Sequence, residues 1–273
     1  MTADSTGETK GFSLNQATTK HWPLDDLVAG CVSAGVGAVG LWREETQAYG
    51  VDKAAALVRD AGLTVSSLCR GGFFQTDDWY DENRRAIDEA AALGTDTLVL
   101  VSGGLGDRDL DAARGHIGDA IGELVPDALA AGVRLAIEPL HPMFCSDRCV
   151  VATLGQALDL AAPYPAEAVG VVIDTYHLWW DDQVWEKIAE AGRAGRIAAF
   201  QLADWITPLP EGVLLGRGLP GTGCVDLRRF ATEVRAAGYR GWTEVEVFHA
   251  DVWARPGAEV LDEAYAGYRA AVS

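Results

Sequence analysis

Four side chains that carry oxygen donors stand at the ends of short apolar runs in the second half of the chain. They are Glu138, Asp174, Gln201 and Glu246. An acid at the end of a buried strand is costly unless it has a partner. Separate ion pairs, or acids that cap the next helix, would explain any one of them, whereas one shared cation explains all four. An all-oxygen donor set favours Mn²⁺, with Mg²⁺ as the alternative, over Zn²⁺.

The last of these runs leaves a choice between two acids. Side chains of a strand repeat every two residues, so Glu244 and Glu246 face the same side. We predict Glu246 as the ligand because it lies closer to the open end of the strand. Glu244 is the alternative.

A histidine stands close to the first of these acids. His141 follows Glu138 by three residues, in a loop between Pro139 and Pro142. Prolines stiffen the backbone and could aim the ring at a substrate, and the pKa of an ordinary imidazole suits a general base. We therefore predict His141 as a catalytic residue. The alternative is a loop histidine that is hydrogen-bonded to the backbone.

Aromatic and arginine side chains also follow the apolar runs. The aromatic residues are Trp42, Phe73, Phe74, Trp179, Trp180, Trp205 and Trp253. Packing between loops explains any single one, whereas seven indicate a wide apolar wall, and we predict that Trp42 and Trp180 contact the substrate. Arg43 and Arg70 are predicted to orient an anionic or hydroxylated ligand. Their alternative is pairing with surface acids.

The elements that position these residues alternate regularly between strand and helix. The apolar runs predict strands at about 11–14, 37–42, 63–69, 96–101, 133–138, 169–174, 196–202 and 242–248. Amphipathic runs predict helices near 24–34, 51–61, 80–93, 108–131, 152–161, 182–191, 226–238 and 256–270. Eight such units in 273 residues predict a single-domain (β/α)8 TIM barrel over residues 11–273, preceded by a flexible polar N-terminus over residues 1–10. In such a barrel the strand ends converge on one pocket.

A doubly wound open sheet is the competing architecture. Residues 35–40 formally match the dinucleotide motif GxGxxG. That motif works only where it follows a strand and opens a helix, because the helix N-terminus must face the pyrophosphate. Here it follows a predicted helix and leads into a predicted strand, which favours a helix stop and a tight turn.

The charge and the composition exclude several classes of partner. The formal net charge is −18 and hydrophobic residues make up 49% of the chain. An acidic chain repels the phosphates of nucleic acids and of anionic membranes, so we expect neither as a partner. The N-terminal residues lack the apolar stretch of a signal peptide, and we expect a cytoplasmic protein.

Six segments together resemble a known superfamily. They read SLCRGG, IEPLHPM, VVIDTYHLWWD, FQLADW, GRGLPGTGCVDL and EVEVF. The chain resembles the xylose-isomerase-like TIM barrels, often called sugar phosphate isomerases/epimerases, over nearly its whole length. The resemblance implies Glu138, Asp174, Gln201 and Glu246 as metal ligands. It also implies that His177 and Arg217 contact the sugar, and that Glu138 and Glu246 could act as bases.

Within the superfamily the chain is most similar to the catalytic (alpha) subunit of C-glycoside deglycosidases. Relatives that epimerise ketoses usually have His where this chain has Gln201, whose carbonyl oxygen still offers a ligand. The resemblance implies lyase-type cleavage between a 3-keto sugar and an aromatic aglycone. It further implies a small β-type partner subunit, with a homo-oligomer as another possibility.

Three other functions stay open at this point. The first is a ketose or sugar-phosphate isomerase or epimerase, which shares the removal of a proton beside a carbonyl. The second is a barrel that binds sugar without catalysis. The third is a metal-dependent endonuclease, which the charge of −18 argues against.

Overall fold

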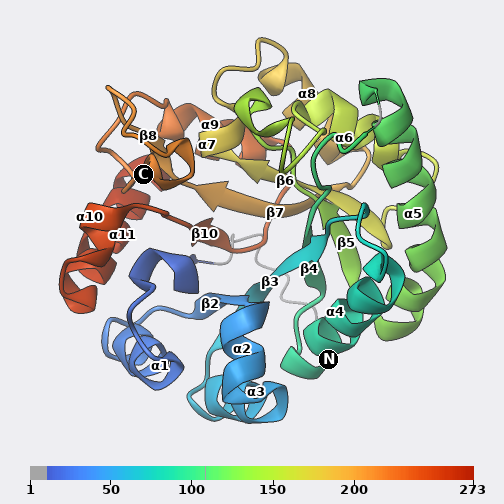
Figure 1. The fold of residues 1–273 in the computed structure, drawn as a ribbon. Coiled ribbons are helices and arrows are strands. Elements are labelled where there is room, and N and C mark those ends of the chain that lie inside the picture. The colour runs from blue at the N-terminus through green and yellow to red at the C-terminus, as the bar shows by residue number, and fades with distance from the viewer. Residues whose placement is uncertain (1–10, 108) are drawn as a thin grey trace.

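Eight short strands pair in parallel and close into a barrel, as Figure 1 shows. The computed structural model describes residues 11–107 and 109–273, so the predicted flexible segment 1–10 lies outside the described residues. The barrel strands are β1 (Phe12–Asn15), β2 (Ala38–Trp42), β3 (Thr64–Gly72), β4 (Thr97–Val101), β5 (Arg134–Ile137), β6 (Val169–Asp174), β7 (Ile197–Leu202) and β10 (Thr243–Val245). Closure depends on β1, in which Leu14 is in register with Val39 on one side and Val245 on the other. The predicted barrel is confirmed, and the open sheet is excluded.

Helices surround the barrel because each has one apolar side to bury. The outer helices are α1 (Leu24–Ser33), α3 (Val51–Asp60), α4 (Trp79–Leu93), α5 (Leu110–Ala131), α6 (Leu154–Ala161), α8 (Val184–Arg193), α9 (Leu227–Ala236) and α11 (Gly257–Val272). Glycines end several of them. Gly94 and Gly132, for example, adopt the left-handed conformation just after α4 and α5. None of the described helices is long and apolar enough to cross a membrane.

Helix α2 (Arg43–Tyr49) was not predicted from the sequence. It starts directly after β2 and is almost wholly polar, so no apolar repeat marks it. Glu44 and Glu45 lie in its first turn, where negative charge stabilises the helix dipole. Gly50, at φ 97°, separates it from α3.

The GxGxxG segment ends a helix and leads into a strand. Gly35, at φ +70°, follows α1, and β2 begins at Ala38. No helix N-terminus follows these glycines directly, so the prediction of a tight turn is confirmed. Gly40 leaves room for a neighbouring side chain, because a Cβ at this position would lie 2.5 Å from the carboxyl carbon of Glu244.

Short elements cover the carboxyl end of the barrel. They are η1 (Gln16–Thr19), η2 (Pro142–Phe144), α7 (Thr175–Leu178), η3 (Val213–Leu215) and α10 (Ala250–Trp253). The long segment between β7 and α9 folds back on itself, because β8 (Asp204–Trp205) and β9 (Arg217–Gly218) form an antiparallel pair. That pair brings Arg217 beside the strand ends.

Candidate metal and sugar site

The four predicted ligands all lie at the carboxyl end of the barrel. Glu138 directly follows β5, Asp174 ends β6, Gln201 is in β7, and Glu246 follows β10. None of them is more than 4% exposed. Parallel strands that close on themselves bring their carboxyl ends together, so side chains far apart in the sequence share one buried cluster.

Three of these four side chains hold a buried oxygen that lacks a hydrogen-bond partner among the described residues. The atoms are Oε1 of Glu138, Oε1 of Gln201 and Oε1 of Glu246. A buried acceptor without a donor costs about 1–3 kcal/mol, more where it is charged. A bound cation would satisfy such oxygens, so these residues fit a divalent metal.

The electrostatics of the cluster also call for positive charge. Burial, followed by the charges of Asp174 and Glu246, raises the pKa of Glu138 well above its usual range. Burial is also the main cause that raises the pKa of Glu246 to about 7. Carboxylates so close together and so far from water are ionised at a cost, which a cation would reduce.

Arg217 supplies the positive charge in this structure. Its Nη1 donates to Oδ2 of Asp174 (2.9 Å) and to Oε2 of Glu246 (2.8 Å). The guanidinium is buried between the rings of Tyr176 and Phe248, at 5.1 and 5.3 Å from their centres. The residue implied as a sugar contact therefore lies among the carboxylates themselves.

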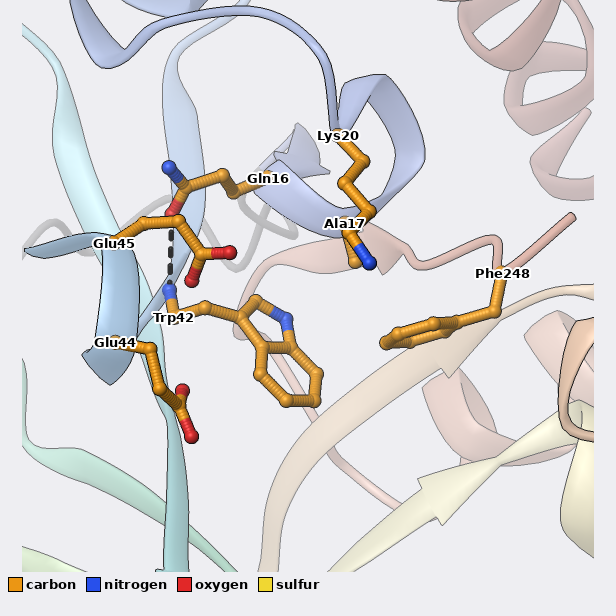
Figure 2. Close-up of a pocket in the computed structure, with 7 residues that line it drawn as sticks. All are labelled: Gln16, Ala17, Lys20, Trp42, Glu44, Glu45 and Phe248. Atoms are coloured by element: carbon orange, nitrogen blue, oxygen red, sulfur yellow. Dashed lines mark hydrogen bonds between the residues drawn. The ribbon is translucent and has the colours of Figure 1, made fainter. Parts of the chain in front are cut away.

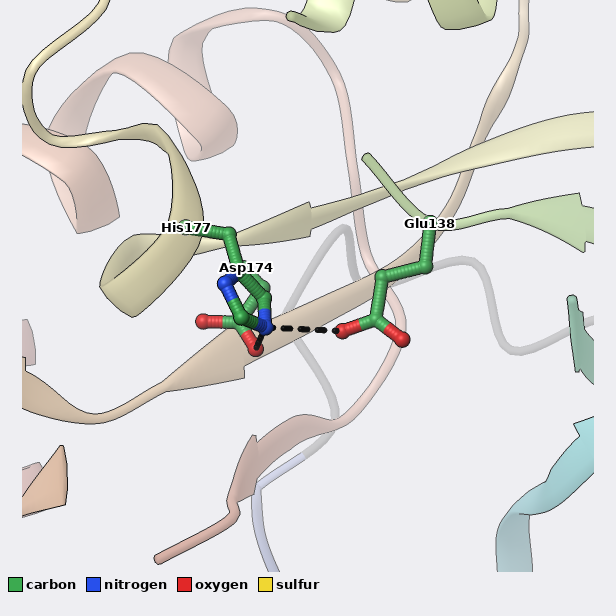
Figure 3. Close-up of side chains that lie close together, drawn as sticks. All are labelled: Glu138, Asp174 and His177. Atoms are coloured by element: carbon green, nitrogen blue, oxygen red, sulfur yellow. Dashed lines mark ion pairs between the residues drawn. The ribbon is translucent and has the colours of Figure 1, made fainter. Parts of the chain in front are cut away.

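His177 belongs to the same cluster, as Figure 3 shows. Its Nε2 lies 3.8 Å from Oε1 of Glu138 and 3.9 Å from Oδ2 of Asp174. These three residues offer ligand atoms within 4.8 Å of one another, so they form a second candidate ligand set. Burial lowers the pKa of His177 well below its usual value, and the ring is neutral.

Both ring nitrogens of His177 face N–H donors. The backbone N–H of His141 donates to Nδ1 (3.2 Å), and Nη2 of Arg217 lies 3.0 Å from Nε2. A neutral imidazole has only one acceptor nitrogen, so the two contacts cannot both be good hydrogen bonds. Movement of Arg217 away from Nε2 would remove this conflict. Because the oxygen of Gln201 has no partner, Gln201 suits a fourth ligand better than His177.

Glu244 is fully engaged below this cluster. Its carboxylate accepts four hydrogen bonds, from the amides of Asn15 (2.7 Å) and Gln201 (3.1 Å) and from the hydroxyls of Ser66 (2.6 Å) and Ser67 (2.8 Å). Two donors on each oxygen satisfy a carboxylate. Glu246, which has an unpartnered oxygen, is therefore the better ligand candidate.

His141 lies between aromatic rings above the cluster. Its ring centre is 5.4 Å from that of Trp180 and 5.0 Å from that of Trp205. The Nδ1 atom accepts from the backbone N–H of Met143 (3.3 Å), and burial lowers the pKa of the ring. A neutral ring whose Nδ1 accepts carries its proton on Nε2. This geometry favours a hydrogen-bond donor over the predicted base, and leaves Glu138 and Glu246 as base candidates.

The two predicted arginines have different surroundings. Arg43 points toward α4, where its Nε donates to Oε2 of Glu89 (2.6 Å). Its partner is a buried acid and not the surface acid of the alternative, and a role of Arg43 in substrate contact has no geometric support. Arg70 lines the central cavity and lies over the ring of Phe73 at 4.2 Å, and it also pairs with the exposed Glu44 (3.7 Å).

The central cavity has a volume of about 180 Å³. Its lining includes Glu138, His177, Arg217 and Glu246 together with the aromatic residues Trp42, Phe73 and Phe248. Other predicted wall residues pack elsewhere: Phe74 is 1% exposed, and the indole of Trp180 donates to the backbone oxygen of His177 (2.7 Å). The apolar wall therefore exists with fewer members than expected.

Sequence reasoning missed Phe248, Leu214 and Arg148, which also line the central cavity. Phe248 had a usable signal, because it follows Glu246 by two residues and continues the alternation of the last strand. Leu214 lies in the short helix η3 and Arg148 in a turn, and neither segment is long enough for a periodic pattern to indicate direction.

Comparisons with known proteins agree with this architecture. A solved protein from Sinorhizobium meliloti 1021 is 44% identical, with a TM-score of 0.91 over 96% of this chain and 98% of its own. The zinc-bound IolI protein has a TM-score of 0.79 at 22% identity, over 96% of this chain and 98% of its own. An inosose isomerase of Halalkalibacterium halodurans is 27% identical over 52% of this chain, a match that spans 49% of that relative.

The family model described as "Xylose isomerase-like TIM barrel" matches residues 28–265. That range contains Glu138, Asp174 and Glu246, which we call the carboxylate cluster, and it also contains Arg217 and His177. The chain therefore belongs to the xylose isomerase-like TIM barrel family.

Proposed function

We propose that this protein is a divalent-metal-dependent enzyme that removes a proton next to the carbonyl group of a keto sugar. The observation that carries the proposal is the set of three unpartnered buried oxygens on Glu138, Gln201 and Glu246. Together with Asp174 they would hold the ion, with Mn²⁺ preferred and Mg²⁺ possible. The ion would polarise the carbonyl oxygen of the substrate.

The two base candidates reach the cavity from different sides. Glu138 follows β5 and Glu246 follows β10, and these strands are separated by β6 and β7 in the barrel. One carboxylate can take the proton beside the carbonyl, and the other can return a proton to another carbon or face. The neutral ring of His177 and the donors of Arg217 suit the hydroxyl groups of the sugar.

Our preferred reaction is the cleavage of a 3-keto C-glycoside. Removal of the proton next to the ketone gives an enediolate, and its electron pair expels the aglycone carbon from the neighbouring position. That carbon takes up a proton, so the carbon–carbon bond breaks without an oxidant. Gln201 and the aromatic wall support this branch, and a small β-type partner subunit belongs to it.

Isomerisation or epimerisation of a ketose is the second candidate. It is favoured by the similarity to an inosose isomerase, and it uses the same proton removal followed by reprotonation. The two reactions differ only in whether a leaving group stands beside the carbanion. The substrate therefore decides between them.

The first test measures metal content after reconstitution with Mn²⁺. We expect about one ion per chain in the wild type and none in Glu246→Ala. Asp88→Ala, which removes an exposed acid on α4, should leave the content unchanged. A wild-type protein that binds no ion would contradict the proposal.

The second test follows the chemistry. The Mn²⁺-loaded protein, with its candidate partner subunit, is given a 3-keto C-glucoside and ketoses in D₂O. Free aglycone supports the deglycosidase, and turnover of ketoses alone supports the isomerase or epimerase. Tight binding without deuterium uptake into any sugar would identify a binding protein instead.

A further inference from the structure

A second cavity opens beside the central one, on the same face of the barrel, and Figure 2 shows it. We call it the outer pocket, and its lining residues are Gln16, Ala17, Lys20, Trp42, Glu44, Glu45 and Phe248. They come from η1 and the residue after it, the end of β2, the start of α2 and the segment after β10. The volume of the outer pocket is about 160 Å³.

Two aromatic side chains belong to both cavities. Trp42 and Phe248 line the outer pocket and the central cavity, with ring centres 5.3 Å apart in an edge-to-face arrangement. The guanidinium of Arg217 lies 5.3 Å from the ring of Phe248, so this ring connects the outer pocket to the carboxylate cluster. The two cavities therefore share this pair of rings.

The wall between the cavities is held in place from below. The indole Nε1 of Trp42 donates to Oδ1 of Asn15 (3.0 Å), and its backbone N–H donates to Oε1 of Gln16 (3.1 Å). Phe248 also packs against Trp253, with ring centres 5.9 Å apart. A preorganised aromatic surface binds a flat ring without a large ordering cost.

The polar groups of the outer pocket identify the chemistry of its occupant. Lys20, Glu44 and Glu45 are exposed side chains that can bind hydroxyl groups as donor and acceptors. Glu44 also pairs with Arg70 (3.7 Å), so Lys20 and Arg70 only balance the two acids and give a phosphate no excess of positive charge. The combination of aromatic faces and carboxylates suits a neutral ring that carries hydroxyl groups.

We propose that the outer pocket binds a second, hydroxylated ring that is attached to the sugar held at the carboxylate cluster. This inference rests on the proposed function, since it takes the central cavity as the place of the sugar. Neither cavity alone reaches the usual range for small-molecule sites, on the order of 300 Å³ and upward, whereas the two together do. The second ring is either a phenolic aglycone or another sugar, because a phenol offers a flat aromatic face, a sugar ring offers an apolar C–H face, and both carry hydroxyl groups.

Binding of unoxidised ligands tests this inference without any turnover, since these ligands have no ketone. The Mn²⁺-loaded full chain is titrated in a calorimeter with glucose, with a phenolic C-glucoside and with a glucose disaccharide. We expect a two-ring ligand to bind about tenfold more tightly than glucose. A gain for only one of the two ligands identifies the phenolic or the sugar ring as the occupant.

Variants of the outer pocket show where that gain arises. Glu45→Trp fills the pocket from an exposed position on α2 and should abolish the gain, while Asp88→Trp, an equal change on exposed α4, should keep it. If Glu45→Trp fails to fold, Glu44→Ala/Glu45→Ala takes its place and should reduce the gain. No gain in the wild type, or a gain that survives in these variants, would overturn the proposal.

The proposed function fails in a different way. Its failure would appear as the absence of deuterium exchange with every keto sugar, whatever the affinities for two-ring ligands. If two-ring ligands are preferred, the preference depends on Glu45 and no deuterium exchange occurs, the proposed function fails. The outer pocket would then still be a binding site for a second hydroxylated ring.

Discussion

The amide nitrogen of Gln201 donates a 3.1 Å hydrogen bond to Oε1 of Glu244, and the amide oxygen of Gln201 has no partner in the part of the chain that the structure describes. An amide can turn either end toward a neighbour, but a carboxylate accepts only the NH₂ end. Glu244 is held by three further donors and cannot turn away. It therefore determines which atom of Gln201 is free to bind a cation.

We expect Glu244→Gln to weaken Mn²⁺ binding by about 10- to 100-fold, the usual effect of losing a partner that orients a metal ligand. A neutral amide oxygen accepts from the NH₂ group of Gln201 more weakly than a carboxylate does, so Gln201 is held less firmly. Calorimetric titration with Mn²⁺ measures the change, and Asp88→Asn, on the exposed side of α4, is the matched control. An unchanged dissociation constant would contradict the orienting role.

Exchanging the two groups tests the same contact from the other side. In Glu244→Gln/Gln201→Glu an amide again donates to a carboxylate, and position 201 again presents an oxygen. We expect the double variant to bind Mn²⁺ more tightly than Glu244→Gln alone. Equal weakness in both variants would mean that Glu244 acts only through the stability of the fold, which thermal unfolding in EDTA reports separately.

Arg217 and a metal ion would compete for the same carboxylates. Arg217→Met leaves Asp174 and Glu246 buried without a positive partner, a change that costs on the order of 3–5 kcal/mol. We expect a lower unfolding temperature for the metal-free variant and a larger rise on adding Mn²⁺ than in the wild type.

The matched control for Arg217→Met is Arg43→Met. Arg43 is also buried and ion-paired, but its partner Glu89 lies on α4, outside the carboxylate cluster. Arg43→Met should lower the unfolding temperature without enlarging the response to Mn²⁺. Equal responses to Mn²⁺ in both variants would show that Arg217 does not compete with the ion.

The raised pKa of Glu246 predicts how the stability of the metal-free protein depends on pH. Burial raises this pKa from 4.5 to about 7, so the folded protein keeps a proton that the unfolded chain has already lost. The free energy of unfolding should therefore fall as the pH rises from about 5 to about 7.5. Denaturant unfolding across this pH range should show a shallower fall of the free energy of unfolding in Glu246→Gln. An identical slope in both proteins would show that Glu246 does not cause the pH dependence.

The sequence was sufficient for the barrel and for the strand-end residues. Apolar runs alternate with amphipathic ones, and an acid such as Asp174 at the end of a buried run is costly unless a cation or a hydrogen-bond donor lies beside it. It was insufficient to choose between Glu244 and Glu246 as the metal ligand, because both face inward. Only the closed barrel shows that Glu244 accepts four hydrogen bonds. The outer pocket could not be predicted, because Gln16 and Glu45 lie in η1 and α2, two short polar elements that no apolar repeat marks.

A substitution of His141 can distinguish a hydrogen-bond donor from a general base at this position. Its Nδ1 accepts from the N–H of Met143, and the Oδ1 of asparagine can replace that acceptor. We expect His141→Asn to slow deuterium exchange at the sugar by less than about tenfold, whereas loss of a general base typically costs about 10²–10⁴. Glu138→Gln and Glu246→Gln should show the larger loss. A loss of base-like size in His141→Asn, together with a changed pH profile of exchange, would return the role of base to His141 and would require its Nδ1 contact with Met143 to open during the reaction.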